Sequence, residues 1–136
     1  MVIFDYKAQS NINFGPTLFF NFDDIMIFVA RKIFRKNFIA IAIFPFIFLK
    51  DKNLRQNKRL INHEKIHLRQ QIELLVLPFY LWYLIEFLVR LIQYKNAKEA
   101  YFNISFEREA YENDENLDFL KNRKDFNFLQ YLNIKS

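Results

Sequence analysis

Residues 60–72 read LINHEKIHLRQQI, and the apolar side chains in this stretch recur with the period of an α-helix. Leu60, Ile61, Leu68 and Ile72 fall on one side of such a helix, and charged or polar residues fill the remaining positions except Ile66. We therefore expect a helix that packs one side against the rest of the chain and presents polar groups on another.

The two histidines of the chain stand four residues apart in this stretch, as His63-Glu64-Lys65-Ile66-His67. Helix positions four apart project from the same face, one turn from each other, so both imidazoles can bind one tetrahedral zinc ion. Glu64 follows His63 directly and lies near the metal without binding it. There it can take a proton from a zinc-activated water and pass it to a leaving amine. The pattern predicts a catalytic zinc site, against the simpler alternative of two surface histidines on a charged helix.

A third zinc ligand is required, because a catalytic zinc ion usually takes three protein ligands. The chain has no cysteine and no further histidine, so the third ligand has to be a carboxylate. Glu107, Glu86 and Glu109 are the downstream candidates. Glu86 also has Arg90 one helical turn away, with which it can form an ion pair.

Composition and charge exclude several other classes of protein. The absence of cysteine excludes disulfides and thiolate metal sites, and a single glycine excludes glycine-rich phosphate loops. The net charge is +5, and basic residues gather at Arg31, Lys32, Arg35 and Lys36 and again between residues 50 and 59. Aromatic residues are not interleaved with these clusters, so we interpret them as solvated surface and expect no nucleic-acid partner.

The N-terminal half predicts strands. Residues 38–49 are apolar, aromatic and β-branched, and residues 38–44 favour a strand. Because Pro45 lacks an N–H, we expect residues 46–49 to form an edge strand or a bent continuation. Near the other end of the chain, residues 119–132 form an amphipathic segment that favours a helix.

The middle of the chain predicts helices. Asp51 offers an N-cap, and a long helical stretch runs from Leu54 to Gln93, with a kink or restart near Pro78. Asn96 ends it. A further helix is expected to begin near Ser105, which is a favourable N-cap residue.

The segment Leu74–Ile92 bears on location, because it is apolar except for Glu86 and Arg90 and is about as long as a bilayer requires. A helix that is apolar on all sides is either a core helix or a membrane helix, and both alternatives stay open. The N-terminus lacks a basic start followed by an apolar core, so we expect no signal peptide. Together with the lack of cysteine, this predicts a cytoplasmic protein, or a membrane-associated one with a cytoplasmic active site.

Residues 103–111 read NISFEREAY and resemble the second zinc helix of the gluzincin metallopeptidases, in which a Glu is followed three residues later by a small residue. Similar patterns occur in the CAAX prenyl proteases, the β-lactam sensor proteases and the small minigluzincins, and the match covers roughly residues 57–115. The resemblance implies that Glu107 is the third zinc ligand and that Ala110 lets the two zinc helices approach closely. Tyr111 stands where the family often has an Asp that orients a ligand histidine.

The resemblance also implies a substrate strand, since an edge strand beside the zinc helix often binds the substrate backbone in such enzymes. Residues 46–49 are the candidate. A donor for the transition-state oxyanion is required as well. The sequence does not choose among the side chains that could supply it, which are Tyr80, Tyr83, Tyr101, Tyr111 and Arg108.

The sequence thus predicts one α+β domain of gluzincin type over residues 1–136, with a strand-rich part at 1–50 and a helical zinc-binding part at 51–136. The expected function is zinc-dependent hydrolysis of a peptide or protein substrate. The main alternative is a small non-enzymatic membrane-associated protein whose metal site is incidental or structural. A helper that binds nucleic acid through residues 31–36 is a weaker alternative, which a steep salt dependence of binding would reveal.

Overall fold

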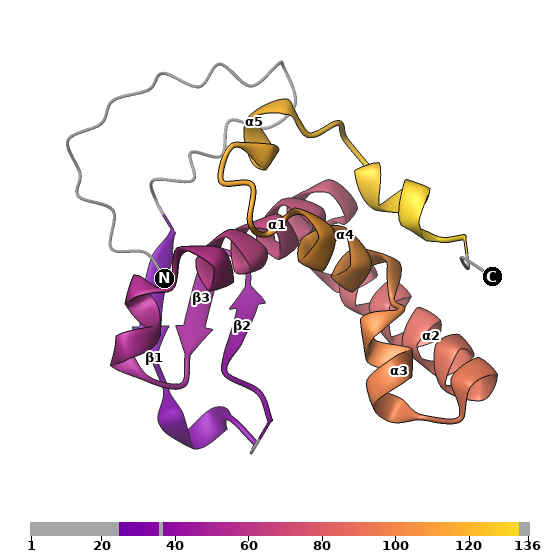
Figure 1. Ribbon diagram of the computed structural model, residues 1–136, viewed down its shortest axis with the longest axis horizontal. Helices are drawn as coiled ribbons and strands as arrows, with labels where there is room; N and C mark the ends of the chain where they lie inside the picture. The colour runs from indigo at the N-terminus through magenta and orange to yellow at the C-terminus, as the bar shows by residue number, and fades with distance from the viewer. Residues whose placement is uncertain (1–24, 36, 134–136) are drawn as a thin grey trace.

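The computed structural model describes residues 25–35 and 37–133 (Figure 1). Residues 1–24 of the expected strand-rich part and Lys36 of the basic cluster lie outside the described residues. The rest forms an α+β fold in which a small sheet packs against a predominantly helical part. The α+β prediction is therefore confirmed.

The sheet has three short strands, β1 (Met26–Val29), β2 (Ala40–Ile43) and β3 (Phe46–Leu49), built from the aromatic and β-branched residues that favour extended backbone. The strand order is β1-β3-β2, with β3 parallel to β1 and antiparallel to β2. Alternation along β3 buries Ile47 and Leu49 against the helical part.

The prediction that residues 46–49 form an edge strand is wrong. They form β3, which pairs with a neighbour along both edges. Pro45 stands in the turn before the strand, so its missing N–H removes no hydrogen bond from the ladder. The strand predicted at 38–44 is present in shorter form as β2, which lies at the edge of the sheet.

The long helical stretch is broken at Leu75. A 3-10 turn, η3 (Lys52–Gln56), is capped by Asp51 as expected, and the Asn57 side chain caps α1 (Lys58–Leu74). Leu75 has a positive φ of 62° and separates α1 from α2 (Val76–Tyr94). The break thus lies three residues before Pro78, where the sequence predicted it. Pro78 falls in the first turn of α2, where a missing N–H costs no helical hydrogen bond.

The remaining helices are short: α3 (Ala97–Phe102), α4 (Ser105–Asn113), α5 (Phe119–Asn122) and a 3-10 turn, η4 (Asn127–Tyr131). Asn96 caps α3, which the sequence did not predict. The expected tail helix is present only as the two separate pieces α5 and η4.

The prediction that Ser105 caps the next helix is wrong. Ser105 is the first helical residue of α4, and its backbone N–H and hydroxyl both donate to the Glu86 carboxylate, at 2.9 and 2.6 Å. A side chain of α2 thus performs the capping.

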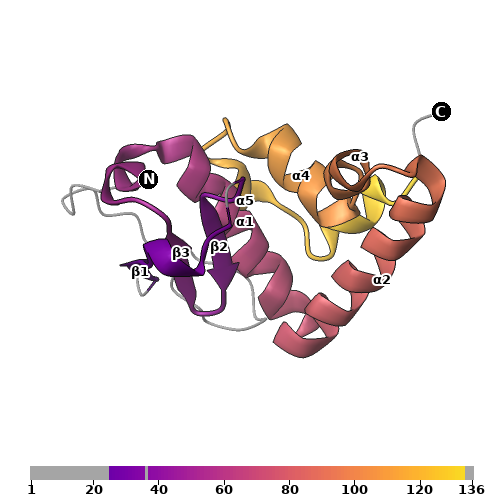
Figure 2. The ribbon, with the colours of Figure 1, turned by 90° about the horizontal axis from the view of Figure 1, so that it is seen from below.

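Helix α1 lies between the sheet and α4, as Figure 2 shows, and contacts both. One core cluster joins Ile61 and Leu68 of α1 to Ala42, Ile47 and Leu49 of the sheet. A second core cluster brings together Phe79, Ile104, Phe106 and Phe128 from α2, α4 and the C-terminal segment. The two clusters fix α1 and α4 relative to the edge of the sheet, and this sets the geometry of the site.

Helix α2 leaves most of its apolar side chains exposed. A window of 18 residues within it is long and apolar enough to cross a membrane, with a mean hydropathy of 1.4, and 17% of that window is buried. Within the described part of the chain, α2 is therefore not a core helix.

Candidate metal centre

The two histidines lie on α1, buried on the side that faces α4 and the sheet edge. Their Nε2 atoms are 3.1 Å apart, and the rings meet edge to face. Ile61 and Leu68, two residues before His63 and one after His67, anchor the helix in the sheet core. Because the apolar side of α1 is fixed there, the polar side turns both imidazoles toward α4.

Glu107 completes a buried cluster with the two histidines. Its Oε2 lies 3.3 Å from His63 Nε2, and its Oε1 lies 3.3 Å from His67 Nε2. Ligand atoms bound tetrahedrally at about 2.0–2.1 Å are separated from one another by roughly 3.3 Å. The two imidazole nitrogens lie 3.1 Å apart and each lies 3.3 Å from one oxygen of the Glu107 carboxylate, which is close to that separation, and the three residues form a group that could hold a metal.

Close packing of α1 and α4 brings Glu107 to this position. Ala110 is fully buried one turn after Glu107, and the Gln70 amide of α1 donates to the Phe106 carbonyl of α4 at 3.2 Å. A larger side chain at 110 would hold the two helices apart. The burial of Ala110 is consistent with the expectation that a small residue at this position allows close packing.

Glu64 is buried beside the cluster but is not a member of it. Burial raises the pKa of its carboxyl group, and the nearby His67 and His63 oppose that rise only in part. The Ala42 backbone N–H of β2 hydrogen-bonds the carboxylate. The sheet edge thus holds Glu64 next to the three candidate ligands, as a group able to exchange a proton rather than to bind the metal.

The charges within the cluster are strongly coupled. Burial opposes ionisation of Glu107, but His67 and His63 hold the pKa of its carboxyl group well below the usual range. For His67 burial lowers the pKa and the Glu107 carboxylate raises it, with a net rise to about 9. A cation is therefore strongly favoured between these side chains, whether it is a proton or a metal ion.

The orientation of His67 is fixed by Gln70. Gln70 Oε1 lies 2.8 Å from His67 Nδ1, while Gln70 Nε2 donates to Glu109 Oε2 at 2.8 Å. Because the amide nitrogen is occupied as a donor, the amide oxygen has to accept, so the proton of neutral His67 sits on Nδ1. His67 Nε2 is then free to offer its lone pair to a metal.

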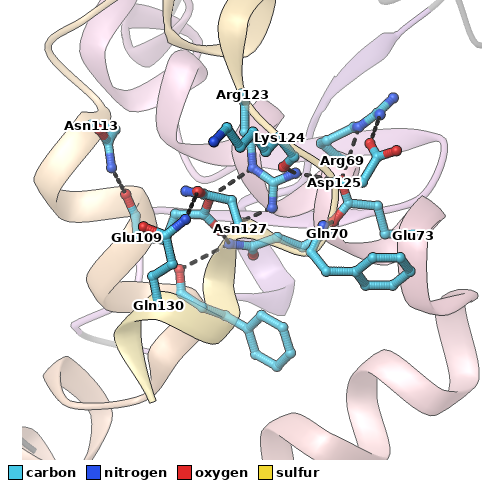
Figure 3. Close-up of polar contacts among 12 residues, drawn as sticks. Arg69, Gln70, Glu73, Glu109, Asn113, Arg123, Lys124, Asp125, Asn127 and Gln130 are labelled. Atoms are coloured by element: carbon cyan, nitrogen blue, oxygen red, sulfur yellow. Dashed lines mark hydrogen bonds and ion pairs between the residues drawn. The ribbon is translucent and has the colours of Figure 1, made fainter. Parts of the chain in front are cut away.

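Glu109 anchors this chain of hydrogen bonds from inside the protein (Figure 3). Its carboxylate accepts from Arg123 Nε at 2.7 Å, Arg123 Nη2 at 3.0 Å and Asn127 Nδ2 at 2.8 Å, besides Gln70. Arg123 also pairs with Glu73 of α1. Glu109, a downstream candidate for the third ligand, is not a member of the His63, His67 and Glu107 group. Glu109 is fully buried and accepts the hydrogen bond from Gln70, the residue that orients His67.

His63 is oriented by Asp114, which the sequence reasoning missed. Asp114 Oδ2 lies 3.3 Å from His63 Nδ1, and Arg59 Nε binds Asp114 Oδ1 at 2.7 Å. Tyr111, at the position where the gluzincins that the sequence resembles often carry an Asp, packs its ring against the His63 imidazole, with the ring centroids 4.4 Å apart. The spacing in the sequence could have indicated Asp114, because it follows Glu107 by seven residues and so falls on the same side of the helix.

Two tyrosines hold the Glu107 carboxylate. Tyr83 of α2 donates to Oε1 at 2.8 Å, and Tyr101 of α3 donates to Oε2 at 3.0 Å. Burial and the Glu107 charge raise the pKa of both phenols, so both stay protonated and can donate. These two oxyanion candidates are thus engaged as supports of a ligand.

The other oxyanion candidates lie around the site. The Tyr80 hydroxyl donates to the Ala42 carbonyl at 2.8 Å, and Arg108 binds the carbonyls of Tyr131 and Asn133. The Tyr111 hydroxyl lies 3.4 Å from that of Tyr101, close to the cluster. Tyr111 is therefore the candidate whose hydroxyl is not taken up by a backbone carbonyl or by Glu107.

Glu86, the rival third ligand, is buried elsewhere. It pairs with Arg90 at 3.2 Å, as its spacing indicated, and caps α4 through Ser105. It is not a member of the His63, His67 and Glu107 group. Glu86 is therefore a structural residue that fixes the start of the helix on which Glu107 lies.

Comparison with protein-family models, with curated proteins and with solved structures found no match. The function has to be inferred from the site itself.

Proposed function

We propose that this chain is a zinc-dependent metallopeptidase of the gluzincin type that hydrolyses peptide bonds. The observation that carries the proposal is the buried group of His63, His67 and Glu107, in which the two imidazole Nε2 atoms lie 3.1 Å apart and each lies 3.3 Å from one carboxylate oxygen, with Glu64 buried beside them. Two imidazoles and one carboxylate form a donor set typical of catalytic zinc.

The number of ligands supports a catalytic site over a structural one. Structural zinc sites are closed by four protein ligands, whereas catalytic sites keep one position open. Within residues 25–35 and 37–133 the candidate metal group contains three side chains. A fourth coordination position is thus left for water or substrate.

The residues around the cluster suit the reaction. A bound zinc ion would lower the pKa of a coordinated water and polarise the substrate carbonyl. Glu64, whose pKa burial raises, is suited to accept a proton and return it to the leaving amine. The Ala42 amide fixes its carboxylate, and Tyr111 is the side chain we assign to hydrogen-bond the oxyanion.

We assign the substrate strand to β2, in place of residues 46–49. The Ile39 carbonyl accepts from Lys50 N–H at 2.8 Å, so the alternation of an antiparallel ladder turns the backbone groups of Ala40 and Ala42 to the outer edge of β2, which pairs with no further strand within residues 25–35 and 37–133. An extended peptide can add to this edge by main-chain hydrogen bonds. The substrate class this supports is a peptide in extended conformation, with its scissile bond near Glu64.

Side chains of the protein limit how far such a peptide can extend, since Glu64 accepts from the Ala42 N–H and Tyr80 donates to the Ala42 carbonyl at 2.8 Å. Gln71 donates to the Ala42 carbonyl at 2.9 Å and accepts from the Phe44 N–H at 2.8 Å. The Ala42 carbonyl and the Phe44 N–H are therefore already hydrogen-bonded to a side chain of the protein. Ala40 is the position of β2 that we assign to substrate pairing beside the site. A substrate would pair with β2 on one side of the scissile bond only.

The test is the substitution Glu64→Gln, assayed on a library of unstructured peptides. We expect the variant to bind zinc as the wild type does and to lose hydrolysis, because Glu64 moves protons and does not bind the metal. Glu115→Gln, at an exposed position in the turn after α4, is the matched control and should keep full activity, because Arg59 keeps its ion pair with Asp114. A zinc-loaded wild type that cleaves no peptide would favour a structural metal site, and loss of zinc in Glu64→Gln would refute the assigned role.

A further inference from the structure

The outer side of α2 is a continuous apolar surface. Its exposed large side chains are Leu77, Leu81, Leu84, Ile85, Leu88 and Ile92. They recur at helical spacing over about 24 Å, at 1.5 Å per residue. Contiguous exposed surfaces of this kind mark sites of interaction with proteins or membranes.

The inner side of α2 is firmly held by the protein. Phe79, Glu86 and Arg90 are its buried residues. Phe79 belongs to the second core cluster, Glu86 caps α4, and Arg90 donates to the Leu132 carbonyl at 2.8 Å. The two charged side chains of α2, Glu86 and Arg90, thus face the protein, which explains how so apolar a helix can carry an ion pair.

The fold argues against α2 crossing a bilayer. Helix α3 follows after a short turn and packs along α2, and both lie together at one edge of the molecule in Figures 1 and 2. Lys98 and Glu99 on α3 are exposed. If α2 crossed the hydrocarbon, α3 would carry these charges back into it at high cost.

We propose that α2 lies flat in the interface of a lipid bilayer, with its outer side in the hydrocarbon of one leaflet and the inner side attached to the protein. This is the geometry of an amphipathic membrane-surface helix, whose apolar face enters by about 5–10 Å. The proposal does not depend on the metal site.

Charge and side-chain type favour a bilayer over a second copy of the chain. The protein carries a net charge of +5, and the exposed Lys95 and Lys98 directly follow the apolar surface, so copies repel each other while anionic headgroups are attracted. Trp82 lies at the side of the surface, and amphipathic aromatics favour the membrane interface.

A groove in the same surface also fits lipid. It has a volume of about 880 Å³ and is lined mainly by apolar side chains, among them Leu81, Trp82, Ile85, Val89 and Leu132. Flexible acyl chains can occupy such an irregular groove.

Trp82 is the only tryptophan in the chain, so its fluorescence reports on this surface directly. The experiment mixes the full-length protein with vesicles of phosphatidylcholine, alone or with phosphatidylglycerol, and with vesicles whose acyl chains are brominated. We expect a blue shift on adding vesicles, quenching by the brominated lipid, and binding that phosphatidylglycerol strengthens and salt weakens.

Other outcomes overturn the proposal. A blue shift that depends on protein concentration, with dimers in solution and no vesicle binding, would assign the surface to a second copy. An emission that is already blue-shifted and does not respond to vesicles would mean that another part of the chain covers α2. Binding without quenching would mean that a different surface touches the lipid.

A pair of double variants tests the surface itself. Replacing Leu84 and Leu88, which are 52% and 48% exposed, with Gln should weaken vesicle binding about tenfold or more, since two large apolar side chains no longer enter the hydrocarbon. The control replaces Ile33 and Leu117, 59% and 48% exposed on other elements, with Gln and should bind vesicles as the wild type does. Equal loss in both double variants, with thermal unfolding unchanged, would refute the assignment to α2.

Discussion

Replacing Glu109 with Ala should destabilise the metal-free protein strongly, although Glu109 is not a metal ligand. The carboxylate is fully buried and accepts four hydrogen bonds, two from Arg123 and one each from Gln70 and Asn127. Its removal leaves the buried Arg123 guanidinium with Glu73 as its remaining carboxylate partner.

The magnitude follows from these contacts. Removing one partner of a buried ion pair costs about 3–5 kcal/mol, because the other charge stays buried. Since Glu73 still neutralises Arg123, we expect a loss of about 3 kcal/mol, at the lower end of that range. In a domain of this size that corresponds to a fall in melting temperature of about 10 °C. Glu109→Gln, which keeps the shape and one acceptor oxygen, should lose less.

The assay is urea and thermal unfolding with a chelator present, so that metal binding does not contribute to stability. Glu115→Ala is the control, because Glu115 forms an exposed ion pair with Arg59 that contributes at most about 1 kcal/mol. A loss below about 1 kcal/mol in Glu109→Ala would refute the reasoning, since it would mean that the network around Glu109 is not formed.

Further predictions concern the metal. Gln70→Ala should weaken zinc binding about 10- to 100-fold, because His67 loses its orienting acceptor; competition with a chelator measures this. Asp114→Ala should weaken zinc binding by a similar factor through His63, again about 10- to 100-fold. Glu107→Ala should abolish tight zinc binding, whereas Glu86→Ala should lower stability by about 3 kcal/mol and still bind zinc. Gln71→Ala should leave zinc affinity unchanged and alter KM, because it removes one of the side chains bonded to the sheet edge beside the site, while Tyr80 still donates to the Ala42 carbonyl.

The contrast between Gln70 and Gln71 provides an internal control. Both are buried amides on the same helix, but one contacts His67 and the other contacts β2. Equal effects of the two alanine variants on zinc affinity would mean that the change acts through general destabilisation of α1. Zinc loss in Glu86→Ala under conditions where the variant is folded would contradict the assignment of Glu107.

The candidate ligands could be found from the sequence because the two histidines show helical spacing and Glu107 stands in a segment that resembles a known zinc motif. His63 and His67 share a helix face by their spacing, and Glu107 followed from its place before Ala110 in a motif. The supports of these ligands were harder to find. Gln70 and Asp114 are ordinary polar residues whose role arises only once α1 and α4 pack together.

The errors in the fold have similar causes. Local signals located the strands but could not set their order, so residues 46–49 were expected at the edge and lie in the centre. Ser105 is a favourable cap by type, yet the cap comes from Glu86, nineteen residues earlier in the chain. The sequence also could not predict which side of α2 is exposed, because its pattern is apolar on all sides and burial depends on which elements pack against the helix.

The central claim is that His63, His67 and Glu107 together hold zinc, and metal content tests it most directly. The protein should be purified without added metal, and its zinc measured by elemental analysis and by titration of chelator-treated protein. We predict one zinc ion per chain in the wild type and in Glu64→Gln, and none held tightly in Glu107→Ala. A folded wild-type protein that contains no zinc and takes up none on titration would contradict the account.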